Sequence, residues 1–131
     1  MNKMEAIIKF DNISVIYDLG KSNEVRALDD ISGQVNAQDY VVFFGPSCCG
    51  KSTLLYVIAG LEKITKGELI VNGRDLKTIS QRELINFNQS TIGFVFQAYY
   101  LIPSLTVKEN ILLPNLFTNK GDSETKKERV S

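Results

Sequence analysis

The sequence predicts an α/β fold organised around a glycine-rich loop, and three adjacent segments support this prediction. The unbroken apolar run Tyr40 to Phe44 has the character of a strand buried on both faces. The next segment, Gly45 to Thr53, fits the pattern G-x-x-x-x-G-K-[ST]. Leu54 to Ala59 then reads as a helix that stops at Gly60, because glycine commonly ends helices. Strand, loop and helix in this order are the context that the pattern requires.

The loop has the chemistry of a phosphate site. Its residues are Gly45, Pro46, Ser47, Cys48, Cys49, Gly50, Lys51, Ser52 and Thr53. Inward-facing backbone N–H groups and the positive end of the following helix together form a preformed anion site. Lys51 can reach the β- and γ-phosphates of a nucleotide, and the Ser52 hydroxyl can ligate Mg²⁺. The alternative is a glycine-rich turn whose lysine is merely solvated.

Composition limits the class of protein. The 131 residues are 44% hydrophobic, which suits one domain or part of a larger one and excludes general disorder. The 15 basic and 15 acidic residues cancel, so nothing favours a nucleic acid or an anionic membrane as partner. Neither a signal peptide nor a run of membrane-spanning length is apparent. We therefore expect a cytoplasmic chain that does not insert directly into a membrane.

The two cysteines, Cys48 and Cys49, lie side by side inside the loop. Adjacent residues cannot link distant segments, so a structural disulfide is not expected. The sequence contains neither a histidine nor a second pair of cysteines, which excludes a zinc site. One interpretation is a pair of thiols near a helix N-terminus, where alkylation would block a nucleotide. The other, which we favour, is that both are small residues filling loop positions.

Short strands surround the loop in the sequence. Ala6 to Tyr17 and Glu24 to Ser32 are rich in β-forming residues and predict an antiparallel sheet beside the loop. Glu68 to Val71 predicts a further strand, closed by the strong hairpin signal Asn72-Gly73.

Two helices and a second buried strand are predicted downstream. Ser80 and Glu83 have the spacing of a capping box, which predicts a helix start. Thr91 to Phe96 predicts a strand with Gln97 at its carboxyl end, the edge at which open α/β sheets bind ligands. Thr106 to Leu113 predicts a helix that stops at Pro114.

These segments together resemble the nucleotide-binding domains of ABC transporters. The resemblance is carried by the phosphate loop, Lys66-Gly67-Glu68 and Ile92 to Gln97. Tyr100 to Ile111 resembles the bacterial branch of lipoprotein-release, macrolide-export and antimicrobial-peptide exporters. The resemblance implies one partial domain, 1–131, truncated before the signature and Asp-Glu segments. In it, about 1–44 and 67–73 form the antiparallel β part, 40–97 the phosphate-loop core and 98–131 the start of a helical subdomain.

The resemblance implies roles for individual residues. Tyr17 corresponds to the aromatic that stacks on adenine, and Gly45 to Thr53 to the loop that binds the ATP phosphates. Gln97 corresponds to the glutamine that contacts Mg²⁺ and the attacking water, since an amide both donates and accepts. Lys51 and Gln97 are then candidate catalytic residues, and Ser52 and Gln97 candidate Mg²⁺ ligands. Without the resemblance, Tyr17 is an ordinary strand aromatic and Gln97 a polar strand end.

The function implied by the resemblance is the ATP-binding part of a transporter ATPase that powers export. Its partners would be a transmembrane permease and a second ATP-binding domain in a head-to-tail dimer. The permease would hold the chain at the inner face of the cell membrane. Alternatives are a non-catalytic nucleotide-binding remnant or regulator, and a soluble ABC ATPase outside transport. The region around Gln97 disfavours an unrelated nucleotide kinase, and nothing in the sequence identifies a transported substrate.

The sequence also departs from the pattern of the family. A Leu-Ser-Gly-Gly-Gln signature, an apolar strand ending in Asp-Glu and a switch histidine do not occur in the 131 residues. Cys48 replaces a glycine that is usual in the loop, and a β-carbon there strains the backbone if φ is positive. Gln38 replaces a turn glycine, and Gly33 stands where an apolar strand residue is usual.

We expect the 131-residue chain by itself to hydrolyse ATP negligibly, because it lacks the carboxylate that positions water for attack. Steady-state phosphate release should therefore equal that of a Lys51→Ala variant in the same assay. Faster phosphate release by the parent chain than by Lys51→Ala would contradict the expectation.

Overall fold

The structure is a computed structural model that describes residues 5–116. Its elements are β1 (Ala6–Tyr17), β2 (Val25–Asn36), α1 (Lys51–Ile58), β3 (Lys66–Val71), β4 (Arg74–Asp75), α2 (Gln81–Thr91) and α3 (Val107–Leu116). They fall into two compact units divided between Gly93 and Phe94. The first unit contains the strands, α1 and α2, and the second contains α3. Within residues 5–116, none of the helices has the length and apolar character needed to cross a membrane.

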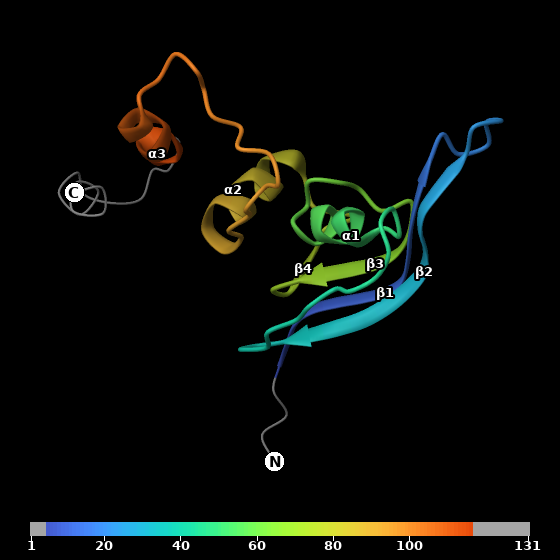
Figure 1. Cartoon of the computed structure of the whole chain (residues 1–131). Coiled ribbons are helices and arrows are strands. Elements are labelled where there is room, and N and C mark those ends of the chain that lie inside the picture. The colour runs from blue at the N-terminus through green and yellow to red at the C-terminus, as the bar shows by residue number, and fades with distance from the viewer. Residues whose placement is uncertain (1–4, 117–131) are drawn as a thin grey trace. The chain divides into compact units, whose positions relative to one another are not determined.

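The strands form one antiparallel sheet, as the sequence predicted, and their order is β2-β1-β3-β4 (Figure 1). Asn72 and Gly73 join β3 to β4 with φ of 47° and 73°. Positive φ at both central residues is what the tightest hairpin turn requires, and Asn-Gly supplies it at low cost. The predicted hairpin is therefore confirmed.

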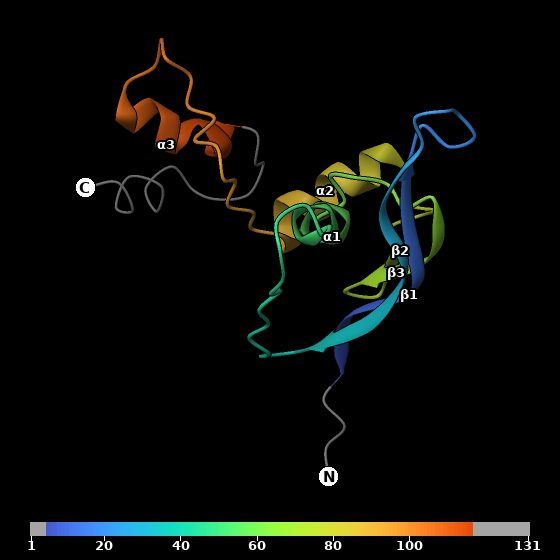
Figure 2. The same ribbon diagram turned by 45° about the vertical axis from the view of Figure 1, so that its right-hand side comes forward.

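Helices α1 and α2 cover one face of this sheet (Figures 1 and 2). The hydrophobic core lies between the two helices and the sheet. Leu54 and Val57 of α1 and Leu84 and Phe87 of α2 supply its helical side. The sheet contributes Phe10, Ile13, Val15, Leu28, Leu69 and Val71. Burying side chains of this size is worth about 1.5–3 kcal/mol each, so this layer is the main source of stability in the first unit.

A β-bulge allows β1 to keep its apolar residues on the core. Between the pairs Phe10↔Gly33 and Ile13↔Ile31, β1 advances by three residues and β2 by two. Asn12, inside the bulge, has φ of 46°. The extra residue shifts the period-two alternation, so that an even-numbered and an odd-numbered residue both reach the core. This explains why the apolar pattern of the segment alternates only in part.

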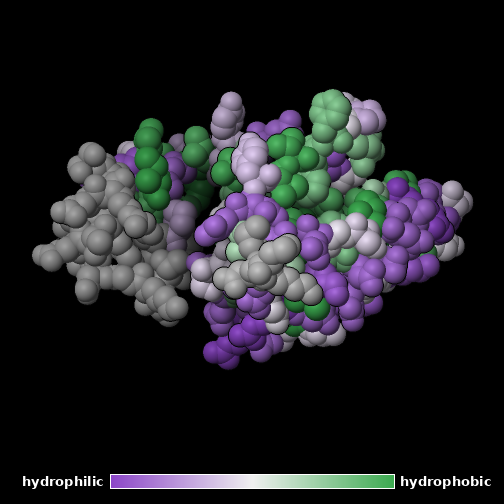
Figure 3. Space-filling view, turned by 90° about the horizontal axis from the view of Figure 1, so that it is seen from below, coloured by the Kyte–Doolittle hydropathy of each residue, from purple (hydrophilic) through white to green (hydrophobic). Residues whose placement is uncertain are grey.

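The two predicted buried strands are not strands in this structure. Tyr40 to Phe44 is extended, with Tyr40 93% and Phe44 97% exposed. Thr91 is the last residue of α2, and the five residues after it, 92–96, form no ladder. The prediction was wrong because a strand exists only by hydrogen bonding to a neighbour, and neither run pairs with another segment of residues 5–116. Figure 3 shows a face on which hydrophobic and hydrophilic residues both reach the surface.

The described part of the second unit consists of a loop followed by α3. The Asn110 side chain fixes the loop, because its amide accepts from the Ile102 N–H at 2.8 Å and donates to the carbonyls of Leu105 and Thr106 at 3.1 and 3.0 Å. The helix does not stop at Pro114 as predicted but runs through it to Leu116. Proline removes one hydrogen bond, yet its φ near −65° is compatible with a helix. Of the predicted helical segment 98–131, residues 117–131 lie outside the described residues.

The predicted capping box at the start of α2 is confirmed. Ser80 Oγ accepts from the Glu83 N–H at 3.3 Å, and Glu83 Oε2 accepts from the Ser80 N–H at 3.2 Å and the Ser80 hydroxyl at 2.6 Å. The hydroxyl and backbone hydrogen bonds from Ser80 lower the pKa of Glu83. The charged carboxylate is therefore favoured in the folded state.

This pKa shift predicts how stability depends on pH. Because the folded pKa lies below the unfolded one, the contribution of Glu83 is present above the unfolded pKa, about 4.3, and is lost as pH falls through the folded value. Glu83→Gln keeps an acceptor at this position but has no proton to take up. The urea midpoint should thus fall less steeply in Glu83→Gln than in the parent below about pH 4.3. Equal slopes in the two proteins would exclude this contribution.

Candidate phosphate site at the start of helix α1

The phosphate loop lies directly against the backbone of β2. A Cβ placed on Gly50 would stand 2.4 Å from the Ala27 carbonyl oxygen and 2.9 Å from a methyl group of Leu28. Gly50 also has φ of 87°, a conformation that side chains disfavour. Only glycine therefore allows the loop to approach β2 this closely and still turn into α1.

Helix α1 presents free backbone donors at its N-terminus. Within residues 5–116, no side chain caps the helix at Gly50, and the first turn contains no acidic residue. By contrast, α2 starts with the Ser80–Glu83 box, and α3 starts with a similar one between Thr106 and Glu109. The uncapped N–H groups and the positive end of the helix dipole form a site for an anion.

Lys51, the first residue of α1, folds back over the loop. Its Nζ donates to the carbonyl oxygen of Gly45 at 3.0 Å, to that of Pro46, and to Cys49 Sγ at 3.5 Å. The ammonium charge is thus held within the curve of the loop, next to the uncapped amides. Ser52, the next residue, is exposed at the start of the helix, where its hydroxyl is available to a ligand.

Cys48 is in a conformation that favours glycine. Its φ is 62°, in the left-handed region. The β-carbon of Cys48 therefore strains the loop backbone, as the sequence analysis predicted for a positive φ. Gln38, for which the resemblance implies a turn glycine, has φ of 69°. Left-handed backbone costs a residue with a β-carbon roughly 1–2 kcal/mol. Both residues therefore hold a backbone conformation that favours glycine.

Tyr17 lies beside the loop. Its hydroxyl donates to Glu62 Oε2 at 3.3 Å, and its ring is 40% exposed. Burial raises the pKa of Tyr17, as do the charge and the hydrogen bond of Glu62, while a side-chain hydrogen bond with Thr53 acts in the opposite direction. The phenol is thus neutral at physiological pH and touches the last residue of the loop.

A cleft of about 220 Å³ opens between the loop and β2. Besides the loop residues 48–53, it is lined by Val25, Arg26 and Ala27. The sequence analysis treated these three only as part of a strand, although the hairpin register Tyr17↔Val25 could have placed them beside Tyr17. The Arg26 guanidinium forms exposed ion pairs with Glu24 at 3.2 Å and Asp29 at 3.3 Å. Such pairs are weak, so Arg26 adds an available positive charge to the cleft.

Gln97 belongs to the second unit and lies there in an exposed bend, after the extended residues 92–96. The structure brings Tyr17 and residues 45–53 together at one site within the first unit. The role of Gln97 toward Mg²⁺ and water stays a prediction.

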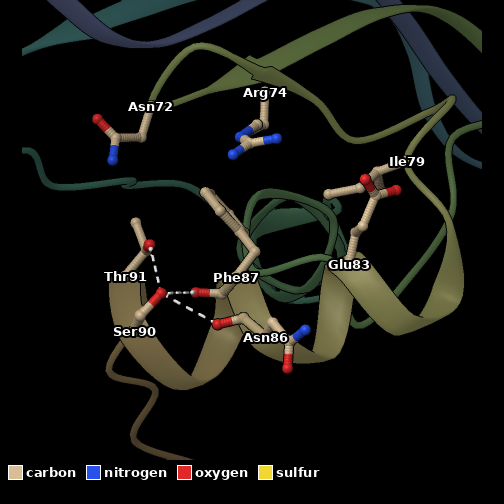
Figure 4. Close-up of a pocket in the computed structure, with 8 residues that line it drawn as sticks. All are labelled: Asn72, Arg74, Ile79, Glu83, Asn86, Phe87, Ser90 and Thr91. Atoms are coloured by element: carbon tan, nitrogen blue, oxygen red, sulfur yellow. Dashed lines mark hydrogen bonds between the residues drawn. The ribbon is translucent and has the colours of Figure 1, made fainter.

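A larger cleft of about 440 Å³ lies elsewhere in the first unit, between the β3–β4 turn and α2 (Figure 4). Asn72 lines it from the turn and Arg74 from β4, and Ser90 and Thr91 line it from the helix. The Ser90 hydroxyl is already hydrogen-bonded to carbonyls of its own helix. Size alone therefore does not identify the functional site, because the uncapped helix and the loop lysine belong to the smaller cleft.

A glycine loop that opens a helix beside a twisted sheet defines a phosphate-binding α/β protein. Residues 28–131 match the ABC transporter family, and the chain belongs to this family. It is 37% identical over 124 residues to an uncharacterised ABC transporter ATP-binding protein of Thermotoga maritima, covering 95% of this chain and 53% of the relative. It is 38% identical over 113 residues to the lipoprotein-releasing system ATP-binding protein LolD 1 of Rhodopseudomonas palustris, covering 86% and 50%.

The fold agrees with solved structures of the same family. The dimeric structure of the ATP-binding cassette MJ0796 in a post-hydrolysis state, bound to ADP and Pi, aligns with a TM-score of 0.84 at 34% identity. The alignment covers 94% of this chain and 53% of that one. This confirms the predicted fold class. The chain spans about half the length of the relatives that it matches.

The left-handed conformation of Cys48 predicts that Cys48→Gly stabilises the protein. Relief of strain outweighs the entropy that glycine loses on folding, so the free energy of unfolding should rise by about 0.5–1 kcal/mol. Cys49→Gly is the matched control, because Cys49 is not among the residues with positive φ. It should lower the free energy of unfolding by about 0.5–1 kcal/mol. Urea denaturation measures both, and a loss of stability in Cys48→Gly would contradict the strain.

Proposed function

We propose that the chain is the ATP-binding part of an ABC transporter ATPase and holds Mg-ATP at the phosphate loop. The observation that carries this proposal is the start of α1. Of the three helices in residues 5–116, it alone begins without a capping box, and it begins inside the loop with Lys51. Bound phosphate would supply the negative charge that a capping carboxylate supplies at α2 and α3.

The loop residues have distinct roles in this proposal. Lys51 Nζ, which donates to the carbonyls of Gly45 and Pro46, would instead donate to the β- and γ-phosphate oxygens of a bound nucleotide. Ser52 offers its hydroxyl to Mg²⁺, which neutralises phosphate charge when bound. The exposed ring of Tyr17 offers a stacking surface for adenine, worth roughly 1–3 kcal/mol. The resemblance implies that the Gln97 amide would contact Mg²⁺ and the attacking water.

The partners follow from the family. We propose a transmembrane permease and a second ATP-binding domain, with the chain at the cytoplasmic face of the membrane. The dimeric MJ0796 cassette supports the second domain. Likeness to the lipoprotein-releasing LolD 1, together with the segment Tyr100 to Ile111, supports an export system.

Calorimetric titration with Mg-ATP tests the proposal. The parent chain should bind saturably, and Lys51→Ala should lose affinity by about tenfold or more, equivalent to about 1.4 kcal/mol, because the charge facing the phosphates is removed. Lys63→Ala is the matched control, since Lys63 is exposed and does not line the loop cleft. Lys63→Ala should bind like the parent. Equal affinity in the parent and Lys51→Ala, or no binding by the parent, would reject the proposal.

A further inference from the structure

The phosphate loop contains two thiols that nucleotide binding does not explain. Cys48 and Cys49 are both free and exposed, and both line the loop cleft with Lys51. Cys49 Sγ lies 3.5 Å from Lys51 Nζ and 3.0 Å from the point where a Cβ on Gly45 would stand. This sulfur is therefore packed against the loop backbone, within reach of the charge that is to face phosphate.

We propose that Cys48 and Cys49 form a redox-sensitive dithiol that exchanges with an anionic low-molecular-weight disulfide and thereby switches off phosphate binding. The inference rests on the proposed function of the loop, and it replaces the interpretation of both cysteines as fillers. An anionic reagent is favoured because the cleft gathers the charges of Lys51 and Arg26 with the uncapped amides of α1. Glutathione disulfide, which carries carboxylates, belongs to this class of compound.

The exchange proceeds in two balanced steps. The thiolate of one cysteine attacks a sulfur of R–S–S–R, which forms a protein–S–S–R bond and releases RS⁻. The neighbouring thiolate then attacks the protein sulfur of that bond, which forms the Cys48–Cys49 disulfide and releases a second RS⁻. The two protons lost by the protein thiols are taken up by the two released thiolates. The protein dithiol loses two electrons, and R–S–S–R gains them.

Both products are incompatible with phosphate in the loop. A mixed disulfide places its R group in a cleft of only about 220 Å³. In the internal disulfide, adjacent Cα atoms are about 3.8 Å apart, whereas bridged cysteines are usually at least about 4.4 Å apart. The bridge therefore forces a change in the backbone of Cys48 and Cys49, which line the cleft. The same strain makes the bond easy to reduce, so the switch is reversible.

The test treats the chain with glutathione disulfide and measures intact mass and Mg-ATP affinity on the same samples. The parent should become lighter by two hydrogens, whereas Cys48→Ser and Cys49→Ser should each retain one glutathione, because neither has a second thiol to displace it. The Kd for Mg-ATP of the treated parent should rise about tenfold or more. Dithiothreitol should restore both the mass and the original affinity of that sample.

Other outcomes contradict the switch in whole or in part. A parent whose mass does not change, or an oxidised parent that binds Mg-ATP as the reduced one does, overturns it and leaves the proposed function intact. If one variant shows no glutathione adduct, the cysteine that it retains is not the attacking thiol. If neither variant shows an adduct, the exchange is overturned. A reduced parent that does not bind Mg-ATP rejects the proposed function and the switch together.

Discussion

The close approach of Gly50 to the Ala27 carbonyl is the contact on which the phosphate site depends. It seats the loop against β2, and β2 is anchored in the core through Leu28, which packs in the same buried cluster as Leu54 and Val57 of α1. The direction of α1 is thereby fixed, and so is the direction in which its first amides point. The position of the phosphate site is set by contact between the backbone of Gly50 and the backbone of Ala27. A methyl group added at Gly50 would push the loop away from β2.

Features determined within a few residues were predictable from the sequence. The loop pattern, the Asn72-Gly73 turn and the Ser80–Glu83 box each depend on local conformation and local hydrogen bonds, and the structure contains all three. The apolar run Tyr40 to Phe44 failed as a strand prediction because its hydrogen-bond partner cannot be read from the run itself. At the site, Arg26 was missed for a similar reason. Arg26 belongs to no sequence motif, and its place beside the loop follows only from the register of β1 on β2.

Gly33 shows how an unusual residue is accommodated by its cross-strand partner. A Cβ at Gly33 would stand 2.7 Å from the tip of the Phe10 ring, which lies across it from β1. The aromatic ring covers the backbone that the missing side chain would have covered, and it is itself buried. Phe10 and Gly33 thus share the volume that two medium-sized apolar residues would fill. A neighbouring side chain cannot compensate in this way at Gln38 and Cys48, because the strain at these residues lies in their own positive φ angles.

The exposed residues of the run Tyr40 to Phe44 affect the fate of the chain in a cell. Two aromatic rings more than nine-tenths in water, on an extended backbone without a ladder, present the surface that chaperones bind and that promotes aggregation. Proteases act on the same kind of segment, because its backbone fits a cleavage site without prior unfolding. Burial of these two rings under another apolar surface would therefore protect the polypeptide from both aggregation and proteolysis.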